Sequence, residues 1–338
     1  MILMILVAKF KKKFYISLFL LILPLFNSCS KNNLDLNGFT MGTSYSIKIN
    51  HNKFFKDSKL KSKIENELNY ISSVFSTYDN KSELSLINNS NKNSFTISDD
   101  MMIVLEKSLY YSNISDGMYD PTVFPLVDLW GFGPTLKSDK PKNDSIFKVL
   151  NYVSYKNIEF SENKINLKNK NTIIDLSSIA KGYAVDKVAD LLLNEGYDNF
   201  MVEIGGEVKC IGRNHGVDWI IGITNPLDDF SLIKTNLSNL SMATSGSYNN
   251  YTYYNGVKYS HIINPKTGFP LENNIISATV VAQDCMDADA LATLLMLFPY
   301  QKGLDLINKT NNVECYLILE EEGKKVIKQS TGFNKYLF

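Results

Sequence analysis

Residues 175–208, DLSSIAKGYAVDKVADLLLNEGYDNFMVEIGGEV, contain the pattern from which we predict the fold class. A strand-like run ends at Asp175, and apolar residues then recur at helical spacing over 180–194, with Gly196 placed to end the helix. A strand-like segment follows at 200–211. Because strands and helices alternate here and elsewhere without a strict βαβ rhythm, we predict an α+β fold rather than a doubly wound parallel sheet.

The segments on either side carry further periodic patterns. Helical spacing predicts helices at 60–74, 101–111, 287–297 and 303–308, and a Gly-, Pro- and Lys-rich stretch predicts a loop at 131–144. Strand-like runs lie at 39–49, 158–175, 219–224, 232–238, 248–263, 275–282 and 313–319. The dipeptide Asn255-Gly256 is typical of a hairpin turn.

Composition limits the classes of function. The chain has 338 residues, 44% of them apolar, which is enough for a sizeable core. Lys+Arg and Asp+Glu both number 35, so the balance argues against whole-chain attraction to nucleic acid. Arg213 is the single arginine, and any anionic ligand must therefore be held by lysines, backbone N–H groups or a metal.

The N-terminus has the pattern of an export signal. Lysines at 9 and 11–13 precede the uncharged run 14–26, which is short for a bilayer span but normal for a signal-peptide core. Cys29 follows the small residue Ser28, as in a bacterial lipobox. We predict cleavage before Cys29 and lipidation of its thiol; an uncleaved anchor or ordinary secretion is the alternative.

The predicted organisation follows from this signal. It comprises a signal peptide at 1–28, a polar tether at 29–37 and a globular part at 38–338. The mature chain would be lipid-anchored in a bacterial cell envelope, facing the periplasm. Cys210, Cys285 and Cys315 then remain, and an odd number without a CxxC pair argues against both a disulfide framework and a zinc site.

Two clusters could bind a phosphorylated ligand. In the first, Asp175, Ser178 and Lys181 surround a predicted helix N-terminus, where unpaired N–H groups attract phosphate. In the second, Asp289 and Thr293 are four residues apart on a predicted helix, so their oxygens share a face and suit Mg²⁺. Each cluster also has a plain structural interpretation: a helix cap in the first, and in the second Asp287 as N-cap beside carboxylates that favour the helix dipole.

Three further clusters are less specific. His261 lies in a segment of turns, where it could serve as a general acid or base or be structural. The hydroxyl- and glycine-rich stretch 242–248 is interpreted as a turn that approaches a ligand. The aromatic and glycine-rich stretch 116–133 could stack on a flat ring or simply pack. The segment 202–208 is interpreted as a strand with a close-packed glycine pair, not a dinucleotide fingerprint.

The order of these clusters along the chain carries a resemblance. The motifs, in sequence, are MGT (41–43), STY (76–78) with SELS (82–85), DGMYDPTVFPLVDLWGFG (116–133), DLSSIAKGYAVD (175–186), EIGGEV (203–208), ATSGSY (243–248), YSHIINPKTGFP (259–270) and ADALAT (288–293). The set resembles the ApbE family, the bacterial FAD:protein FMN transferases, from about Gly38 to the C-terminus.

The resemblance implies a fold and an activity. It implies two intimately packed lobes with mixed or antiparallel sheets and flanking helices, and an FAD cleft between them. It further implies that Mg²⁺ helps to split the FAD pyrophosphate, that FMN is attached through a phosphoester to a Thr or Ser of an acceptor protein, and that AMP leaves. Acceptors in the family are subunits of membrane redox complexes and other exported flavoproteins.

The resemblance also implies site residues. Asp289, Thr293 and Ser178 are similar to the metal ligands, and His261 to the family's histidine near the reacting phosphate; His261 or Asp289 would act as the base. Residues similar to the FAD contacts are Met41, Tyr78, Met118, Tyr119, Asp120, Asp175, Lys181 and Ile263. The chain departs from the family at Asn264, where Asp is common, and the position of Lys181 varies between Lys and Glu.

Three other functions stay open on the sequence alone. A hydrolase could use the same metal and cleft to release FMN and AMP from FAD, with water replacing the protein hydroxyl. A non-catalytic lipoprotein would bind FAD and leave it intact. A purely structural lipoprotein would bind no flavin.

Overall fold

The computed structural model describes residues 32–51, 58–133, 135, 139–224, 232–247, 251–271 and 273–338 of the chain. The predicted signal peptide, Cys29 and Tyr248 lie outside these residues. None of the helices described there is long and apolar enough to cross a bilayer. The helices are α2 (Leu60–Phe75), α3 (Glu83–Asn88), α4 (Asp99–Ile114), α5 (Phe124–Leu129), α6 (Asn143–Leu150), α7 (Ala180–Asn194), α8 (Cys285–Leu297), α9 (Tyr300–Asn308) and the 3-10 turns η2 (Tyr155–Asn157) and η3 (Phe333–Tyr336).

The fold is built on one large antiparallel sheet, which confirms the α+β class. Its strand order is β1-β2-β6-β7-β10-β13-β14-β15, and β3-β5-β4, β8-β9 and β11-β12 form smaller sheets. The strands are β1 (Asn32–Thr40), β2 (Thr43–His51), β3 (Ser94–Thr96), β4 (Ile158–Ser161), β5 (Lys164–Leu167), β6 (Phe200–Ile204), β7 (Glu207–Ile211), β8 (Trp219–Thr224), β9 (Leu232–Leu237), β10 (Leu240–Gly246), β11 (Tyr251–Tyr254), β12 (Val257–Ser260), β13 (Ile275–Ala282), β14 (Glu314–Glu321) and β15 (Lys324–Gln329).

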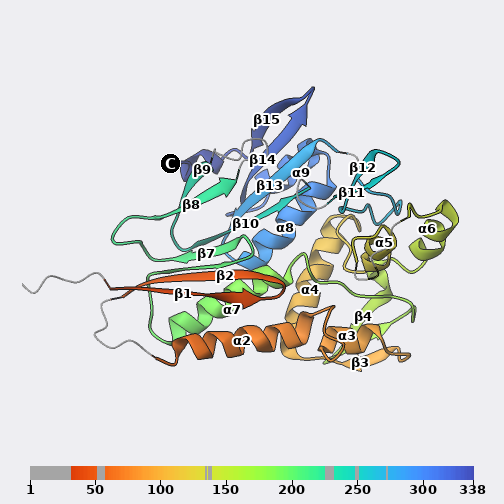
Figure 1. The fold of residues 1–338 in the computed structure, drawn as a ribbon, viewed down its shortest axis with the longest axis horizontal. Coiled ribbons are helices and arrows are strands. Elements are labelled where there is room, and N and C mark those ends of the chain that lie inside the picture. The colour runs from red at the N-terminus through yellow and green to blue at the C-terminus, as the bar shows by residue number, and fades with distance from the viewer. Residues whose placement is uncertain are drawn as a thin grey trace, which may run out of the picture.

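Helices cover one face of this sheet and the β8–β9 hairpin covers part of the other. On the helical side, α7 packs against β6 and β7, and α8 against β10 and β13 (Figure 1). Successive residues of β6 face opposite sides of the sheet. Phe200, Val202 and Ile204 are buried in the main core with α7, whereas Met201 packs against the cluster beneath β8 and β9.

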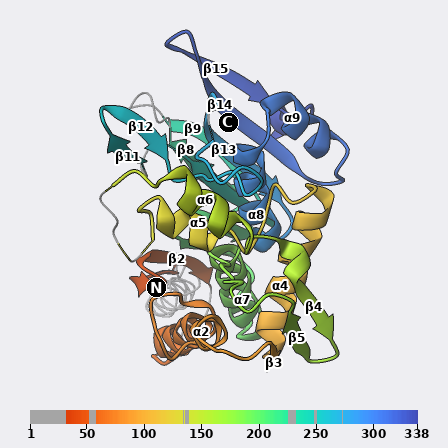
Figure 2. The ribbon, with the colours of Figure 1, turned by 90° about the vertical axis from the view of Figure 1, so that its right-hand side faces the viewer.

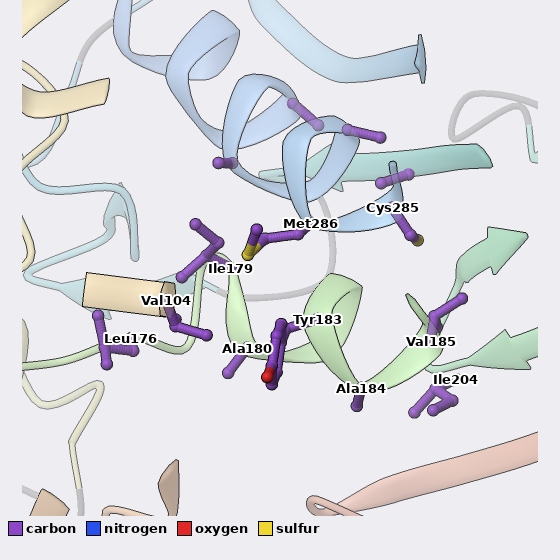
Figure 3. Packing of buried hydrophobic residues seen from close by; sticks show 14 of the residues in the cluster. Val104, Leu176, Ile179, Ala180, Tyr183, Ala184, Val185, Ile204, Cys285 and Met286 are labelled. Atoms are coloured by element: carbon purple, nitrogen blue, oxygen red, sulfur yellow. The ribbon is translucent and has the colours of Figure 1, made fainter. Parts of the chain in front are cut away.

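The contact between α7 and α8 is unusually close at Gly182. A Cβ there would lie 2.3 Å from the carbonyl oxygen of Cys285, so only glycine fits without a shift of backbone. The carboxylate of Asp186, one turn further along α7, accepts the backbone N–H of Cys285 at 3.0 Å and of Met286 at 2.9 Å. Asp186 thereby caps α8 from a neighbouring helix. Figure 3 shows the apolar side chains that the two helices bury around this contact.

A second, smaller core lies beside the sheet. It contains Leu126 of α5, Ile146 of α6 and Tyr254 of β11, arranged around Trp130. The indole N–H of Trp130 donates to the carbonyl of Gly268 at 2.8 Å, and the Tyr254 hydroxyl donates to the carbonyl of Trp130 at 2.9 Å. Figures 1 and 2 show α5, α6 and the β11–β12 hairpin gathered on one side of the large sheet. This cluster forms the second lobe.

The helix predicted at 180–194 has those bounds in the structure, and Gly196 has a φ of +78° just beyond it.

Three predictions about strands were wrong or incomplete. The tether was predicted to reach residue 37, but β1 begins at Asn32 and pairs with β2 along its length, because Leu34 and Leu36 alternate toward the core. Residues 32–37 of the predicted tether therefore belong to the sheet.

The other two errors concern the middle and the far edge of the sheet. The stretch 242–248, predicted as a turn, provides most of β10, a central strand between β7 and β13. β15 was not predicted; it is a largely polar edge strand beside β14. In addition, Asp287 is not the N-cap of α8, since the helix begins after Asp284 and the Asp287 carboxylate instead accepts the Tyr111 hydroxyl at 2.7 Å.

Candidate active site

A cavity of about 360 Å³ lies where the smaller lobe meets the large sheet and the ends of α7 and α8. It collects ten of the predicted site residues from four separate segments. They are Met118, Tyr119, Asp120, Asp175, Ser178, Lys181, His261, Ile263, Asp289 and Thr293. Met41 and Tyr78 do not line this cavity: Met41 lies in the β1–β2 turn, and the Tyr78 side chain is 79% exposed after α2.

The segment before α7 forms one wall. The backbone N–H of Ser177 donates to Asp175 at 2.8 Å, and burial raises the pKa of Asp175. The Ser178 hydroxyl lies 2.7 Å from the Tyr119 hydroxyl. Burial raises the pKa of Tyr119, so its phenol stays protonated near neutral pH. The N-cap side chain of α7 makes no capping hydrogen bond, but the Ala180 N–H donates to the carbonyl of Leu176 at 2.9 Å and the Gly182 N–H donates to Asp289.

Asp120 has a positioning role in the opposite wall. Its carboxylate accepts the backbone N–H of Thr122 at 2.8 Å, the Thr122 hydroxyl at 2.6 Å and the backbone N–H of Tyr155 at 2.8 Å. Burial raises its pKa, while these hydrogen bonds favour the charged form. Asp120 therefore fixes the loop before α5 against the segment that contains Tyr155.

Asp289 and Thr293 project from successive turns of α8, as their spacing predicts. The backbone N–H of Gly182 donates to Asp289 Oδ2 at 2.9 Å, and Asp289 is only 3% exposed. The Thr293 hydroxyl lies 3.1 Å from that of Ser245 on β10. The missing side chain at Gly182 thus brings α8 close enough for its carboxylate to cap a backbone group of α7.

Lys181 lies between two buried carboxylates. Its ammonium is 2.8 Å from Glu207 Oε1 and 3.7 Å from Asp289 Oδ1. Burial opposes the charge of Lys181, but Asp289 and Glu207 together hold its pKa above the usual value. The lysine therefore contributes a permanent positive charge at the cavity wall.

Glu207 is a site residue that the sequence analysis missed. It is 3% exposed, and its Oε2 is a buried acceptor without a hydrogen-bond partner among the described residues. Burial, and then the charge of Asp289, raise the pKa of Glu207 to about 8, against the effect of Lys181. The sequence feature that could have identified Glu207 is the glycine pair before it. Gly205 and Gly206 have φ of +62° and +104° and form a hairpin turn, which directs Glu207 toward α7.

The donors present fit a hard cation, though not a cluster of acidic ligands. Across the described ranges no group of three or more His, Cys, Asp or Glu side chains could hold a metal. Asp289 and Thr293 offer a carboxylate and a hydroxyl from one helix face, and Ser178 lines the same cavity. One carboxylate with neutral oxygens is the kind of set that Mg²⁺ accepts when phosphate oxygens complete its shell.

His261 also faces the cavity, from the segment that follows β12. Its ring lies edge-on to Phe132, with the ring centroids 6.1 Å apart. Ile263 of the same segment is buried and forms an isolated bridge with Pro270. The smaller lobe thus contributes a histidine to a cavity whose charged wall belongs to the larger one.

The chain was compared with known proteins. A model of the ApbE family matches residues 41–317. The chain is 36% identical over 322 residues to the FAD:protein FMN transferase of Vibrio cholerae, covering 93% of this chain and 94% of that protein. It is 36% identical over 323 residues to the FAD:protein FMN transferase of Haemophilus influenzae, covering 91% and 93%.

Solved structures agree with this result. The flavin transferase ApbE from Vibrio cholerae superposes with a TM-score of 0.84 at 34% identity, covering 91% of this chain and 100% of that one. The apo form of the Pseudomonas stutzeri flavinyl transferase ApbE gives a TM-score of 0.83 at 28% identity, covering 90% and 96%. The family match over residues 41–317, with relatives above 30% identity along most of the sequence, shows that this chain belongs to the ApbE family.

Proposed function

We propose that the chain transfers FMN from FAD to a Ser or Thr hydroxyl of an acceptor protein and releases AMP. The relatives named above are FAD:protein FMN transferases, and they match nearly the whole chain. The observation that carries the proposal is the single cavity that gathers ten dispersed residues of the predicted site.

In the proposed reaction, the acceptor oxygen forms a bond to the phosphorus of the FMN half of FAD. The bond from that phosphorus to the bridging oxygen breaks, and AMP leaves with this oxygen. The charge of Lys181 and the positive end of the α7 helix dipole would stabilise the pyrophosphate. Mg²⁺, when bound, would supply further positive charge there, held by Asp289, Thr293 and an oxygen of Ser178.

The acceptor hydroxyl must also lose a proton. We assign this proton to His261, because Asp289 Oδ2 already accepts the Gly182 N–H and the same carboxylate would hold Mg²⁺. An imidazole at the cavity wall is suited to general-base work near neutral pH.

The place of action is part of the proposal. Cleavage before Cys29 and lipidation of its thiol would tether the protein to a membrane, facing the periplasm. The acceptors would then be exported flavoprotein subunits of membrane redox complexes. In cells grown with a labelled fatty acid, the wild-type chain should gain the label and stay with membranes, and Cys29→Ser should do neither. Equal labelling of the two would refute the anchor.

The transfer itself is tested by mass. The full-length chain in detergent is incubated with FAD, Mg²⁺ and an exported acceptor domain that bears an exposed Thr, and the acceptor is weighed intact. A gain of one FMN residue, lost with EDTA, supports the transferase. AMP and free FMN without a labelled acceptor would favour hydrolysis of FAD. Bound but intact FAD would favour a flavin carrier.

A further inference from the structure

A second hollow lies on the opposite face of the large sheet from α7 and α8. Its volume is about 520 Å³, and it runs between β8 and the strands β6, β7 and β10. Its apolar floor comes from Met201, Val208 and Met242, and its far side from Ile220 and Gly222 of β8. We call this hollow the β8 groove. The proposed transfer reaction, as set out above, gives it no role.

The β8 groove adjoins the cavity described above. Gly205, Thr244 and Gly246 border both. The strand pairing explains this arrangement. The pairing of β10 with β7 ends at Met242↔Val208, but β10 continues to pair with β13 as far as Gly246. The sheet therefore opens between β7 and β10, and the hollows on its two faces meet at this opening.

One wall of the groove is an unpaired strand edge. β8 pairs with β9, and within the described part of the chain no strand lies on its other side, where the groove runs. In Figure 1, β8 lies between β9 and β7. Alternate residues of β8 direct their N–H and C=O groups away from β9, and such an edge is a template for an added strand.

We propose that the β8 groove binds the acceptor as an extended segment that pairs with the free edge of β8 and carries its Ser or Thr to the opening at Gly205 and Gly246. This inference rests on the proposed function. Strand addition supplies affinity through main-chain hydrogen bonds, and the apolar floor selects alternate side chains. The acceptor protein would thus approach from one face of the sheet, while Lys181 and Asp289 act from the other.

The geometry answers a requirement of the reaction. A polypeptide hydroxyl must reach a phosphorus held against α7 and α8, and an extended chain is the narrowest form in which a polypeptide can be threaded. Gly205, Gly206 and Gly246 add no side chains of their own at the opening, which Thr244 also borders.

The test uses the full-length chain and the acceptor domain that gains FMN in the mass assay above. Ile220 is 48% exposed, so Ile220→Asp puts a charge in the groove without emptying the core. We expect the acceptor KM to rise about tenfold or more, while kcat at saturating acceptor stays near that of the wild type. Val217→Asp, at a site 62% exposed just before β8 but outside the groove, is the matched control.

A second measurement is independent of turnover. Amide hydrogen exchange in residues 219–224 should slow when an acceptor whose reactive Thr is replaced by Val is added to the FAD-loaded chain. An unchanged KM in Ile220→Asp, or unchanged exchange in β8, would overturn the groove assignment. Failure of any acceptor to gain FMN would instead refute the proposed function, so the two failures are distinguishable.

Discussion

The ammonium of Lys181 on α7 and the carboxylate of Glu207 on β7 lie 2.8 Å apart in the wall of the cavity. The second oxygen of Glu207 is buried and has no hydrogen-bond partner among the described residues, and Asp289 lies on the other side of the lysine. Two buried carboxyl groups thus flank one cation in the cavity wall.

The first prediction concerns the pH dependence of stability. The folded-state pKa of Glu207 is raised to about 8, from an ordinary value of 4.5. The folded protein therefore binds more protons than the unfolded one between these values, and the free energy of unfolding should fall as pH rises through this window. Urea unfolding at several pH values in EDTA, compared between wild type and Glu207→Gln, measures the effect. Equal pH slopes in the two proteins would contradict it.

The second prediction concerns Asp289. Asp289→Asn keeps an acceptor for the Gly182 N–H but loses the charge, so stability should change by about 1 kcal/mol or less, while Mg²⁺-dependent transfer falls by about a hundredfold or more. Asp287→Asn is the matched control. It lies on the same helix, where Asp287 accepts the Tyr111 hydroxyl and pairs with Lys107 outside the cavity. Similar losses in both variants would argue against the metal assignment.

The third prediction separates His261 from the metal. His261→Gln should lower kcat by about a hundredfold, as expected for removal of a general base, and leave the Mg²⁺ concentration for half-maximal rate unchanged. A rate close to that of the wild type in this variant would move the proton to another group.

The fourth prediction concerns the contact between the two helices. Gly182→Ala places a Cβ 2.3 Å from a backbone oxygen, so the free energy of unfolding should fall by about 2 kcal/mol or more. Gly303→Ala in α9 makes its nearest contact, at 2.7 Å, with the end of the flexible Leu295 side chain. There the gain in helix propensity, about 1 kcal/mol, offsets the crowding. Thermal unfolding of both variants would be compared, and a smaller loss at Gly182 would refute the argument.

Sequence periodicity captured the longer helices but missed the short helices α3, α5 and α6, and it captured the strands unevenly. The helix α7 was predicted to the residue, because its apolar stripe and Gly196 mark both its course and its end. β10 was missed, since its serines and threonines are polar by composition but face helices or neighbouring strands. β1 was hidden by the polar residues on either side of Leu34 and Leu36.

The site was predictable where its residues lie in motifs. Asp289 and Thr293 follow from their helical spacing, and the cavity brings them together with Ser178 and Lys181. Glu207 was missed because its role depends on tertiary structure. A continuous strand over 203–208 and a hairpin with its turn at the two glycines would place Glu207 differently. The conformation of these glycines therefore determines which face of the sheet the Glu207 carboxylate occupies.

Because β1 already includes Asn32, a lipid on Cys29 would limit the distance between the folded enzyme and the membrane surface. With a lipid on Cys29, only Ser30 and Lys31 would separate the anchored residue from Asn32, a span of roughly 10 Å even for a fully extended chain. The protein would stay close to the bilayer surface and would meet its partners by lateral diffusion in the plane of the membrane. Acceptors free in the periplasm would rarely be met, whereas those that share the membrane would be encountered at a high effective concentration.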